Sequence, residues 1–262
     1  MTEFKDSGSE VTRIDRKKWP LIVVLSFPGL VLIFTVFSLA VLYSYIKPRY
    51  QLAERFDLTE LDRRIPGRAF VRLDDVSSHF VDALIAAEDP RFYQHRGIDY
   101  QGLGKAIYLN AKDSKQINEG ADSLTKKLIR LNFAEKLKAR PPNPALEICL
   151  AHRVETYLEK EQILELYINQ IDFGSGYFGI TAASEGFFGK SPKALNLSES
   201  ATLVGVIRNP FYRCPRRYPE ACKTMRDYVL NLMAVRGVID QGTAANALKS
   251  PIEVRAEGSE SE

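Results

Sequence analysis

The longest run of apolar residues lies near the start of the chain, from Trp19 to Ile46, and contains no charged residue. A helix of this length would reach about 40 Å at ~1.5 Å per residue, more than the ~30 Å hydrocarbon core of a membrane. Aromatic residues suit the two membrane interfaces, with Trp19 at one end and Tyr43 and Tyr45 at the other. The run is longer than the apolar stretch of a signal peptide, so the pattern predicts an uncleaved transmembrane helix over residues 19–46.

Polar segments flank this helix on both sides. Residues 1–18 are predicted to form a disordered tail. Four basic side chains in residues 13–18 stand against three in residues 47–55, a count that favours a cytoplasmic N-terminus. Residues 47–69 are charged with spaced apolar positions, and we expect a juxtamembrane helix or arm that ends near Pro66.

Beyond residue 70 the apolar positions recur with the spacing of α-helices, as at Val76, Phe80 and Leu84, and no segment shows sustained strand alternation. Residues 70–250 are therefore expected to form one mainly α domain, followed by a disordered tail over 251–262. A polar stretch over 113–122 is typical of a mobile loop. Helices are predicted over residues 76–89, 100–112, 123–133, 145–160, 161–173, 182–187, 199–207 and 218–235, with a short one after Gly242.

Composition and charge narrow the class of protein. A hydrophobic content of 45% with 10% aromatic residues suffices for a packed core. The net charge of +3 argues against a non-specific nucleic-acid binder, and no zinc-finger or phosphate-loop motif occurs. Cys149 lies among apolar residues and is expected to be buried. Cys214 and Cys222 flank a loop and could form a disulfide if the domain faces an oxidising compartment.

An acidic pair, Glu88 and Asp89, follows the first apolar stretch of this domain. Pro90 disfavours helical geometry at Asp89, so the helix should end beside the pair. A carboxylate at an apolar helix end can serve as a general base or acid, although such a pair taken alone is more often a solvated helix terminus. Chemistry at an anomeric carbon commonly uses two carboxyl groups, and Glu147 is the best second candidate because its helix face is otherwise small.

Basic residues are concentrated between the two candidate acids. Such a cluster suits an anionic, phosphate-bearing substrate. Taken alone, such a cluster is more often a solvated helix face or a surface that binds lipid headgroups near the membrane. The members are Lys126, Lys127, Arg130, Lys136, Lys138 and Arg140.

Several ordered blocks together resemble the peptidoglycan glycosyltransferase family, which comprises monofunctional transglycosylases and the matching domain of bifunctional penicillin-binding proteins. The first family motif, E-D-x-x-F-x-x-H-x-G, is matched by Glu88, Asp89, Phe92, His95 and Gly97. "GADSLTKKLIR" aligns with G-x-S-T-I-T-Q-Q, "NPALE" with R-K-x-x-E, and "KEQILELYINQ" with K-x-x-I-L-E-x-Y-L-N. "LNLSESATLVGVIRNP" and "MRDYVLNLM" match the last blocks, so the resemblance covers residues 70–250.

The resemblance implies a lysozyme-like helical fold and a catalytic role for Glu88 and Glu147. Glu88 would deprotonate the sugar 4-hydroxyl of a lipid-linked acceptor, which attacks the anomeric carbon of lipid II or of a growing strand with inversion. Glu147 would lie near the departing pyrophosphate, which a divalent cation (Mg or Mn) or basic side chains would stabilise. No organic cofactor and no dedicated set of metal ligands is expected. The expected substrate-binding residues are Asp89, Phe92, His95, Ser123, Thr125, Lys126, Lys127 and Arg130.

Two side chains can be interpreted as structural rather than catalytic. His95 is equally well explained as a structural histidine that holds the turn after the acidic pair. Glu155 is interpreted as a solvated or salt-bridged residue rather than a third acid.

The resemblance also implies where the protein works. It places the chain in the plasma (inner) membrane as a single-pass protein, with the catalytic domain outside the cytoplasm. The expected partners are the lipid-linked disaccharide-peptide, the membrane and other cell-wall synthesis proteins, without nucleic acid.

Three departures from the family pattern concern the residues around the pyrophosphate. The chain has Asp122-Ser123 for Ser-Thr, Lys126-Lys127 for Gln-Gln, and Asn143-Pro144 for Arg-Lys. Our hypothesis is that Lys126, Lys127 or Arg140 restores the missing charge from another backbone position. The alternative is that substrate handling is weakened or lost.

Two other functions remain open from the sequence. One is a degenerate, non-catalytic relative that binds lipid-linked precursor or a cell-wall partner, which the departures favour and the intact first motif opposes. The other is a lytic transglycosylase-like enzyme, which would share a helical fold and a catalytic glutamate but would cleave glycan.

Overall fold

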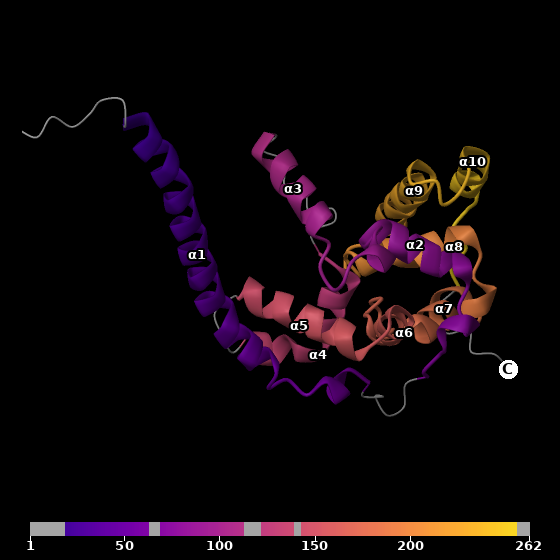
Figure 1. Ribbon diagram of the computed structural model, residues 1–262. Coiled ribbons are helices and arrows are strands. Elements are labelled where there is room, and N and C mark those ends of the chain that lie inside the picture. Colours follow the sequence, from indigo (N-terminus) through magenta and orange to yellow (C-terminus); the bar gives the residue numbers. More distant parts are fainter. Residues whose placement is uncertain (1–18, 63–68, 113–121, 139–142, 256–262) are drawn as a thin grey trace, which may run out of the picture. The chain divides into compact units, whose positions relative to one another are not determined.

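A computed structural model describes residues 19–62, 69–112, 122–138 and 143–255 (Figure 1). The chain divides into two compact units, residues 1–49 and 50–262. The predicted N-terminal tail, most of the predicted loop over 113–122, and Arg140 lie outside the described residues.

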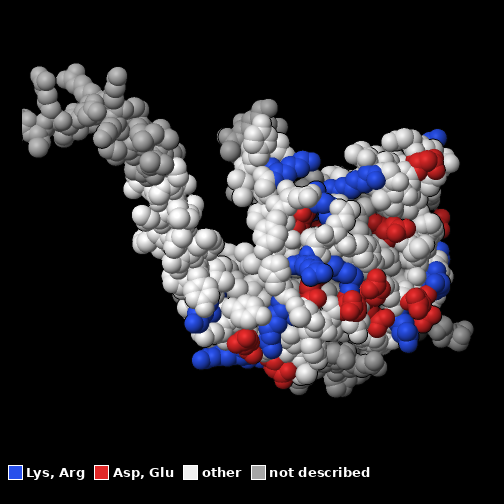
Figure 2. Space-filling view, viewed as in Figure 1, with Lys and Arg blue, Asp and Glu red and all other residues white. Residues whose placement is uncertain are grey.

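The first unit contains most of helix α1 (Trp19–Ala53). Between Pro28 and Ala53 this helix contains an 18-residue stretch with a mean hydropathy of 2.2, so it is long and apolar enough to cross a membrane. Its large apolar side chains from Leu30 onward are exposed, and Figure 2 shows the helix without acidic or basic side chains along most of its length. A helix that is apolar on all sides needs a lipid or protein environment.

The regular secondary structure in the described part of the second unit is helical. This part contains two isolated β-bridges and no strand. This confirms the mainly α prediction. The helices are α2 (Ser78–Glu88), α3 (Tyr100–Lys112), α4 (Leu124–Lys138), α5 (Pro144–Tyr157), α6 (Lys160–Gln170), α7 (Ile180–Phe188), α8 (Leu197–Ile207), α9 (Pro219–Val235) and α10 (Gln241–Lys249). Short 3-10 helices connect them at Leu58–Asp62, Leu73–Asp75, Phe92–Gln94 and Pro192–Ala194.

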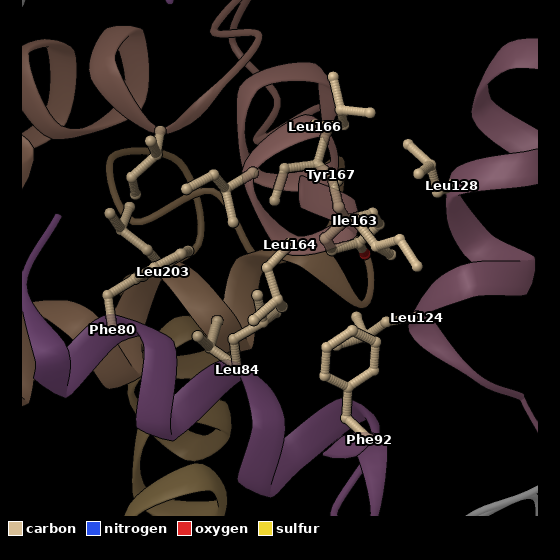
Figure 3. Packing of buried hydrophobic residues seen from close by; sticks show 14 of the residues in the cluster. Phe80, Leu84, Phe92, Leu124, Leu128, Ile163, Leu164, Leu166, Tyr167 and Leu203 are labelled. Atoms are coloured by element: carbon tan, nitrogen blue, oxygen red, sulfur yellow. The ribbon is translucent and has the colours of Figure 1, made fainter. Parts of the chain in front are cut away.

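One continuous core joins two groups of helices, α2 with α8 and α9, and α4 with α5 and α6. Figure 3 shows Phe80 and Leu84 of α2 facing the same interior as Leu164 of α6. Leu124 and Leu128 of α4 approach that interior from the other side. Each fully buried Leu or Phe contributes about 1.5–3 kcal/mol by leaving water, so the core holds α2 and α4 in place.

The segment that was expected to be a juxtamembrane arm packs on the domain. Phe56 is buried and its ring lies 5.2 Å from that of Phe133 in an edge-to-face arrangement. The guanidinium of Arg153 donates to the carbonyl oxygens of Ala53 and Phe56, both at 2.7 Å. The residues after α1 are therefore part of the globular unit.

The C-terminal segment also packs further than expected. The backbone N–H of Arg255 donates to the carbonyl of Phe187 at 2.7 Å, and the carbonyl of Arg255 accepts from Arg216 Nε at 3.0 Å. Residues 251–255 are thus held against α7, although the sequence placed them in the disordered tail.

All three cysteines, Cys149, Cys214 and Cys222, are free and buried. Cys149 lies in the core as expected. Cys214 Sγ lies 3.2 Å from Ser175 Oγ, and burial raises the pKa of Cys222 to about 12. The disulfide that the sequence left open is not formed.

Candidate active site

Glu88 is the last residue of α2, and its side chain is only 7% exposed. Its Oε2 accepts a hydrogen bond from the ammonium of Lys127 on α4. Its Oε1 lies 3.4 Å from Nε of Arg208, just after α8, and makes no hydrogen bond within the described part of the chain. The carboxylate is therefore held between two cations, and its buried Oε1 lacks a hydrogen bond.

Asp89 has a different role from its neighbour. Its side chain is 2% exposed, and its two oxygens lie 2.9 and 3.1 Å from Nε2 of His95. Oδ2 also accepts from the backbone N–H of Leu124 at 2.9 Å. Asp89 thereby ties the end of α2 to the turn after it and to the first residue of α4. This geometry matches the structural interpretation of His95.

Gly97, the last residue of the first motif, lies where the turn passes close to α5, and only glycine fits there. Its φ is +84°, and a Cβ there would lie 2.7 Å from the backbone carbon and oxygen of Ala151. Phe92 is fully buried in the same turn, with the ammonium of Lys160 4.3 Å above its ring. Both residues shape the turn that carries His95.

Arg130 connects Glu147, the second candidate acid, to Asp122, which replaces a serine of the family pattern. Its guanidinium donates to Asp122 Oδ2 at 2.7 Å and to Glu147 Oε2 at 2.8 Å. The ammonium of Lys126 lies 3.4 Å from Asp122 Oδ1 and 3.8 Å from Glu147 Oε2. The two carboxylates and two cations form one network, which we call the Glu147 network.

The charges of this network stabilise each other. Burial works to lower the pKa of Arg130, but hydrogen bonds to Glu147 and Asp122 outweigh it and raise the pKa above its usual value. Burial likewise works to raise the pKa of Asp122, but Arg130, Lys126 and Lys127 outweigh it and the pKa falls below its usual value. Arg130 and Asp122 therefore stay charged near neutral pH.

Arg213, in the connection between α8 and α9, adds a further cation near Glu88. Burial lowers its pKa, the charge of Arg208 lowers it further, and the charge of Glu88 opposes both effects. Its guanidinium has no hydrogen bond or ion pair with any described residue, and its Nη1 is buried. The site then holds two more cations than carboxylates, which suits an anionic ligand. The cations are Lys126, Lys127, Arg130, Arg208 and Arg213, and the carboxylates are Glu88, Asp122 and Glu147.

Two residues predicted to bind substrate use their hydroxyls within the protein. Ser123 donates to the carbonyl of Gly97, and Thr125 donates to Glu155. Glu155 also pairs with Lys160 at 2.7 Å, which agrees with its interpretation as a salt-bridged residue. Ser123 and Thr125 fix the start of α4, and their contact with substrate stays a prediction.

The third departure has a structural explanation. Asn143 accepts from the backbone N–H of Leu146 at 3.2 Å, and Pro144 occupies the first turn of α5. Asparagine at the N-cap and proline in the first turn are both strong helix-start signals. Where the family has two cations, this chain therefore begins a helix that presents Glu147.

The sequence did not indicate Arg208 and Arg213 as members of the site. The predicted basic cluster, in turn, included Lys136, which lies elsewhere. Lys136 pairs with Glu60 at 2.6 Å, away from both candidate acids. Arg208 and Arg213 reach Glu88 only because α8 packs on α2. The sole sequence signal was the density of basic residues after α8 in "IRNPFYR".

An almost buried carboxylate can take a proton from one substrate, and the excess cations around it can stabilise an anionic group on another. Comparison with known families agrees with that chemistry, because residues 57–234 match the family described as Transglycosylase. The chain belongs to this family, and its enzyme class is glycosyltransferase.

Similar proteins include longer ones. Penicillin-binding protein 1A of Rickettsia felis is 34% identical over 195 residues, covering 74% of this chain and 25% of that protein. The protein of the same name from Haemophilus influenzae is 36% identical over 190 residues, covering 72% and 22%. This chain thus spans about a quarter of the length of these relatives.

A relative of more similar length comes from Cupriavidus necator and is named as a transglycosylase. It is 33% identical over 186 residues, covering 71% of this chain and 79% of that protein. Among solved structures, penicillin-binding protein 1A of Haemophilus influenzae matches with a TM-score of 0.44 at 24% identity, covering 72% of this chain and 18% of that one.

Proposed function

We propose that this chain is a membrane-anchored peptidoglycan glycosyltransferase. It would polymerise lipid II, a lipid-linked disaccharide-peptide, into glycan strands and release polyprenyl pyrophosphate. The observation that carries the proposal is the environment of Glu88, an almost buried carboxylate held between Lys127 and Arg208 within a transglycosylase-family domain.

Glu88 would act as the general base. Its carboxylate takes the proton from the 4-hydroxyl of the acceptor sugar as that oxygen attacks the anomeric carbon of the donor. The new C–O bond forms on the face opposite the leaving group, so the configuration inverts. The bond from the anomeric carbon to the phosphate oxygen breaks, and its electron pair leaves with the pyrophosphate.

The cations would hold that leaving group. Arg130, Lys126 and Lys127 lie together at the start of α4, so charge comes from this helix rather than from the segment before Glu147. This arrangement supports our hypothesis of compensation for the missing Arg-Lys pair. Positive groups fixed in advance stabilise the charge that develops on the departing oxygen.

A divalent cation remains part of the proposal. No group of three or more His, Cys, Asp or Glu side chains suited to a metal occurs in the described ranges. Mg²⁺ at phosphate sites commonly uses one or two carboxylates together with substrate phosphates. Glu147 fits that role, because its contacts with Arg130 and Lys126 use only Oε2. Such an ion would neutralise charge on the pyrophosphate.

The apolar helix α1 supports anchoring in the plasma membrane, which we propose with the N-terminus in the cytoplasm and the domain outside. An anchor confines the enzyme and its lipid-linked substrate to one surface and raises their effective concentration. Other cell-wall synthesis proteins are proposed partners.

The test is polymerisation by the purified full chain in detergent or liposomes, with labelled lipid II as substrate. We expect long glycan strands and released polyprenyl pyrophosphate. Incubation with purified sacculi forms the second arm, in which we expect no soluble fragments. Fragment release without polymer would instead indicate the lytic enzyme.

One observation favours the non-catalytic alternative. Lys127, which replaces a glutamine of the family pattern, donates a hydrogen bond to Oε2 of Glu88. If this contact were permanent, Glu88 could not act as a base. Binding of lipid II with no turnover under any condition would support that alternative.

A further inference from the structure

The cations of the site are held in two different ways. Arg130 contacts two carboxylates at once, Asp122 and Glu147, through separate guanidinium nitrogens. The ammonium of Lys127 has one hydrogen-bond partner in the described structure, Oε2 of Glu88. Arg130 is therefore fixed in place, whereas Lys127 can leave its partner by breaking one contact.

The chemistry of Lys127 permits such a movement. An ammonium on a flexible four-carbon stem can redirect its three donors without a change in the backbone. Its side chain is 21% exposed, whereas that of Glu88 is 7% exposed. The Lys127 side chain is thus more accessible to an entering ligand than the carboxylate that it contacts.

A diphosphate would compete with Glu88 for this ammonium. It brings two or three negative charges against the single charge of the carboxylate, and charge-assisted bonds to phosphate are as strong as those to carboxylate. The fixed Arg130 and the nearby charge of Arg213 would attract it to the same site. Because interactions between charges strengthen with burial, the competition is sharpest at a site from which water is excluded.

We propose that Lys127 couples binding of the donor's diphosphate to release of the base, an inference that rests on the proposed function. In the ligand-free enzyme Lys127 pairs with Glu88. When the diphosphate binds, the Lys127 ammonium turns to its oxygens, and Oε2 of Glu88 becomes free alongside Oε1. The base is then available only when a donor is in place, which protects against unproductive proton transfer.

The cycle balances around this movement. The hydroxyl proton of the acceptor passes to Glu88, the glycosidic C–O bond forms, and the diphosphate departs with the electron pair of the broken bond. Glu88 then gives its proton to solvent, and Lys127 returns to the carboxylate. Lys127 acts through Glu88 and the diphosphate, so it is a positioning residue.

Lys126 provides a matched comparison on the same helix. It is adjacent to Lys127, but its ammonium faces Asp122 and Glu147 instead of Glu88. Lys126→Gln removes the same charge from the site and should leave the pair between Lys127 and Glu88 intact. Lys127→Gln removes that pair.

Carbodiimide cross-linking of the full chain tests the proposal, because the reagent joins a carboxylate directly to an amine that contacts it. We expect a peptide linking Glu88 to Lys127 in ligand-free protein and in Lys126→Gln. Methylenediphosphonate, which is not hydrolysed, should lower its yield about tenfold at ten times its dissociation constant, set by calorimetry. The pair of Lys190 and Glu199, 2.6 Å apart on the surface, serves as an internal control whose yield should not change.

Three outcomes would overturn the proposal: no link between Glu88 and Lys127 in ligand-free protein, a link that persists when calorimetry shows saturation, or no binding of methylenediphosphonate. Binding should weaken about tenfold in Lys127→Gln and be retained in Lys127→Arg, since a charge-assisted bond is lost only in the first. Polymerisation of lipid II is measured separately, so failure of the proposed function shows there while the cross-link reports on the coupling alone.

Discussion

The two candidate acids of this site are held in opposite ways. Glu88 is nearly buried, contacts the ammonium of Lys127, which has no other hydrogen-bond partner in the described structure, and keeps one oxygen without a hydrogen bond. Glu147 is more exposed and shares Arg130 with Asp122 in a network of fixed contacts. The difference indicates that the first half of the site changes its contacts during a reaction, while the second half provides a constant charge.

Removal of Arg130 should have the largest effect on the fixed half. Arg130→Met leaves Asp122 and Glu147 close together with only Lys126 between them. Loss of one preorganised donor at a developing charge costs about 10²–10³-fold, and we expect a fall of that size in lipid II turnover. Lys136→Met is the control, because Lys136 pairs with Glu60 outside the site and its loss should leave turnover unchanged. Equal losses in the two variants would contradict the assignment.

Gly97→Ala tests the scaffold of the Glu88 half. The added Cβ meets the backbone of Ala151, and the φ of +84° is unfavourable for alanine. We expect the free energy of unfolding in detergent to fall by about 2–4 kcal/mol. Gly104→Ala on α3 is the matched control, since nothing lies within 4 Å of its Cβ, and it should be neutral or stabilising by up to about 1 kcal/mol. A neutral Gly97→Ala would show that the turn does not pack closely on α5.

The smallest effect concerns pH and the Glu147 network. The pKa of Asp122 lies below its ordinary value of 3.8, so its contribution to stability is complete above that value and is lost as pH falls through the folded-state pKa. Wild type should therefore lose more stability than Asp122→Asn between about pH 4 and about pH 2. Unfolding curves of both proteins across this range measure the difference. Parallel curves would mean that Arg130 gives Asp122 no extra stability.

Much of the fold follows from the sequence, because apolar spacing and helix-start signals are local. The helix predicted over 100–112 has the observed bounds of α3, and Asn143 with Pro144 begins α5. The first motif located Glu88 at the end of α2 for a local reason, the proline two residues later.

The rest of the site depends on contacts that no local pattern encodes. Lys126 and Lys127 are neighbours, but successive residues on a helix point about 100° apart, so they face different carboxylates. Sequence could not tell which lysine meets Glu88. Arg208 and Arg213 follow from the packing of α8 on α2, which is set by the core rather than by any motif.

The most direct test of the central claim is lipid II turnover by Glu88→Gln beside Glu161→Gln. Glutamine keeps the size of the side chain and cannot accept the hydroxyl proton. Glu161 is an exposed carboxylate on α6. We predict that Glu88→Gln loses about 10²–10⁴-fold in turnover, the contribution of a general base, while Glu161→Gln and the unfolding curves of both variants match wild type. Turnover by Glu88→Gln at the wild-type rate would contradict the account.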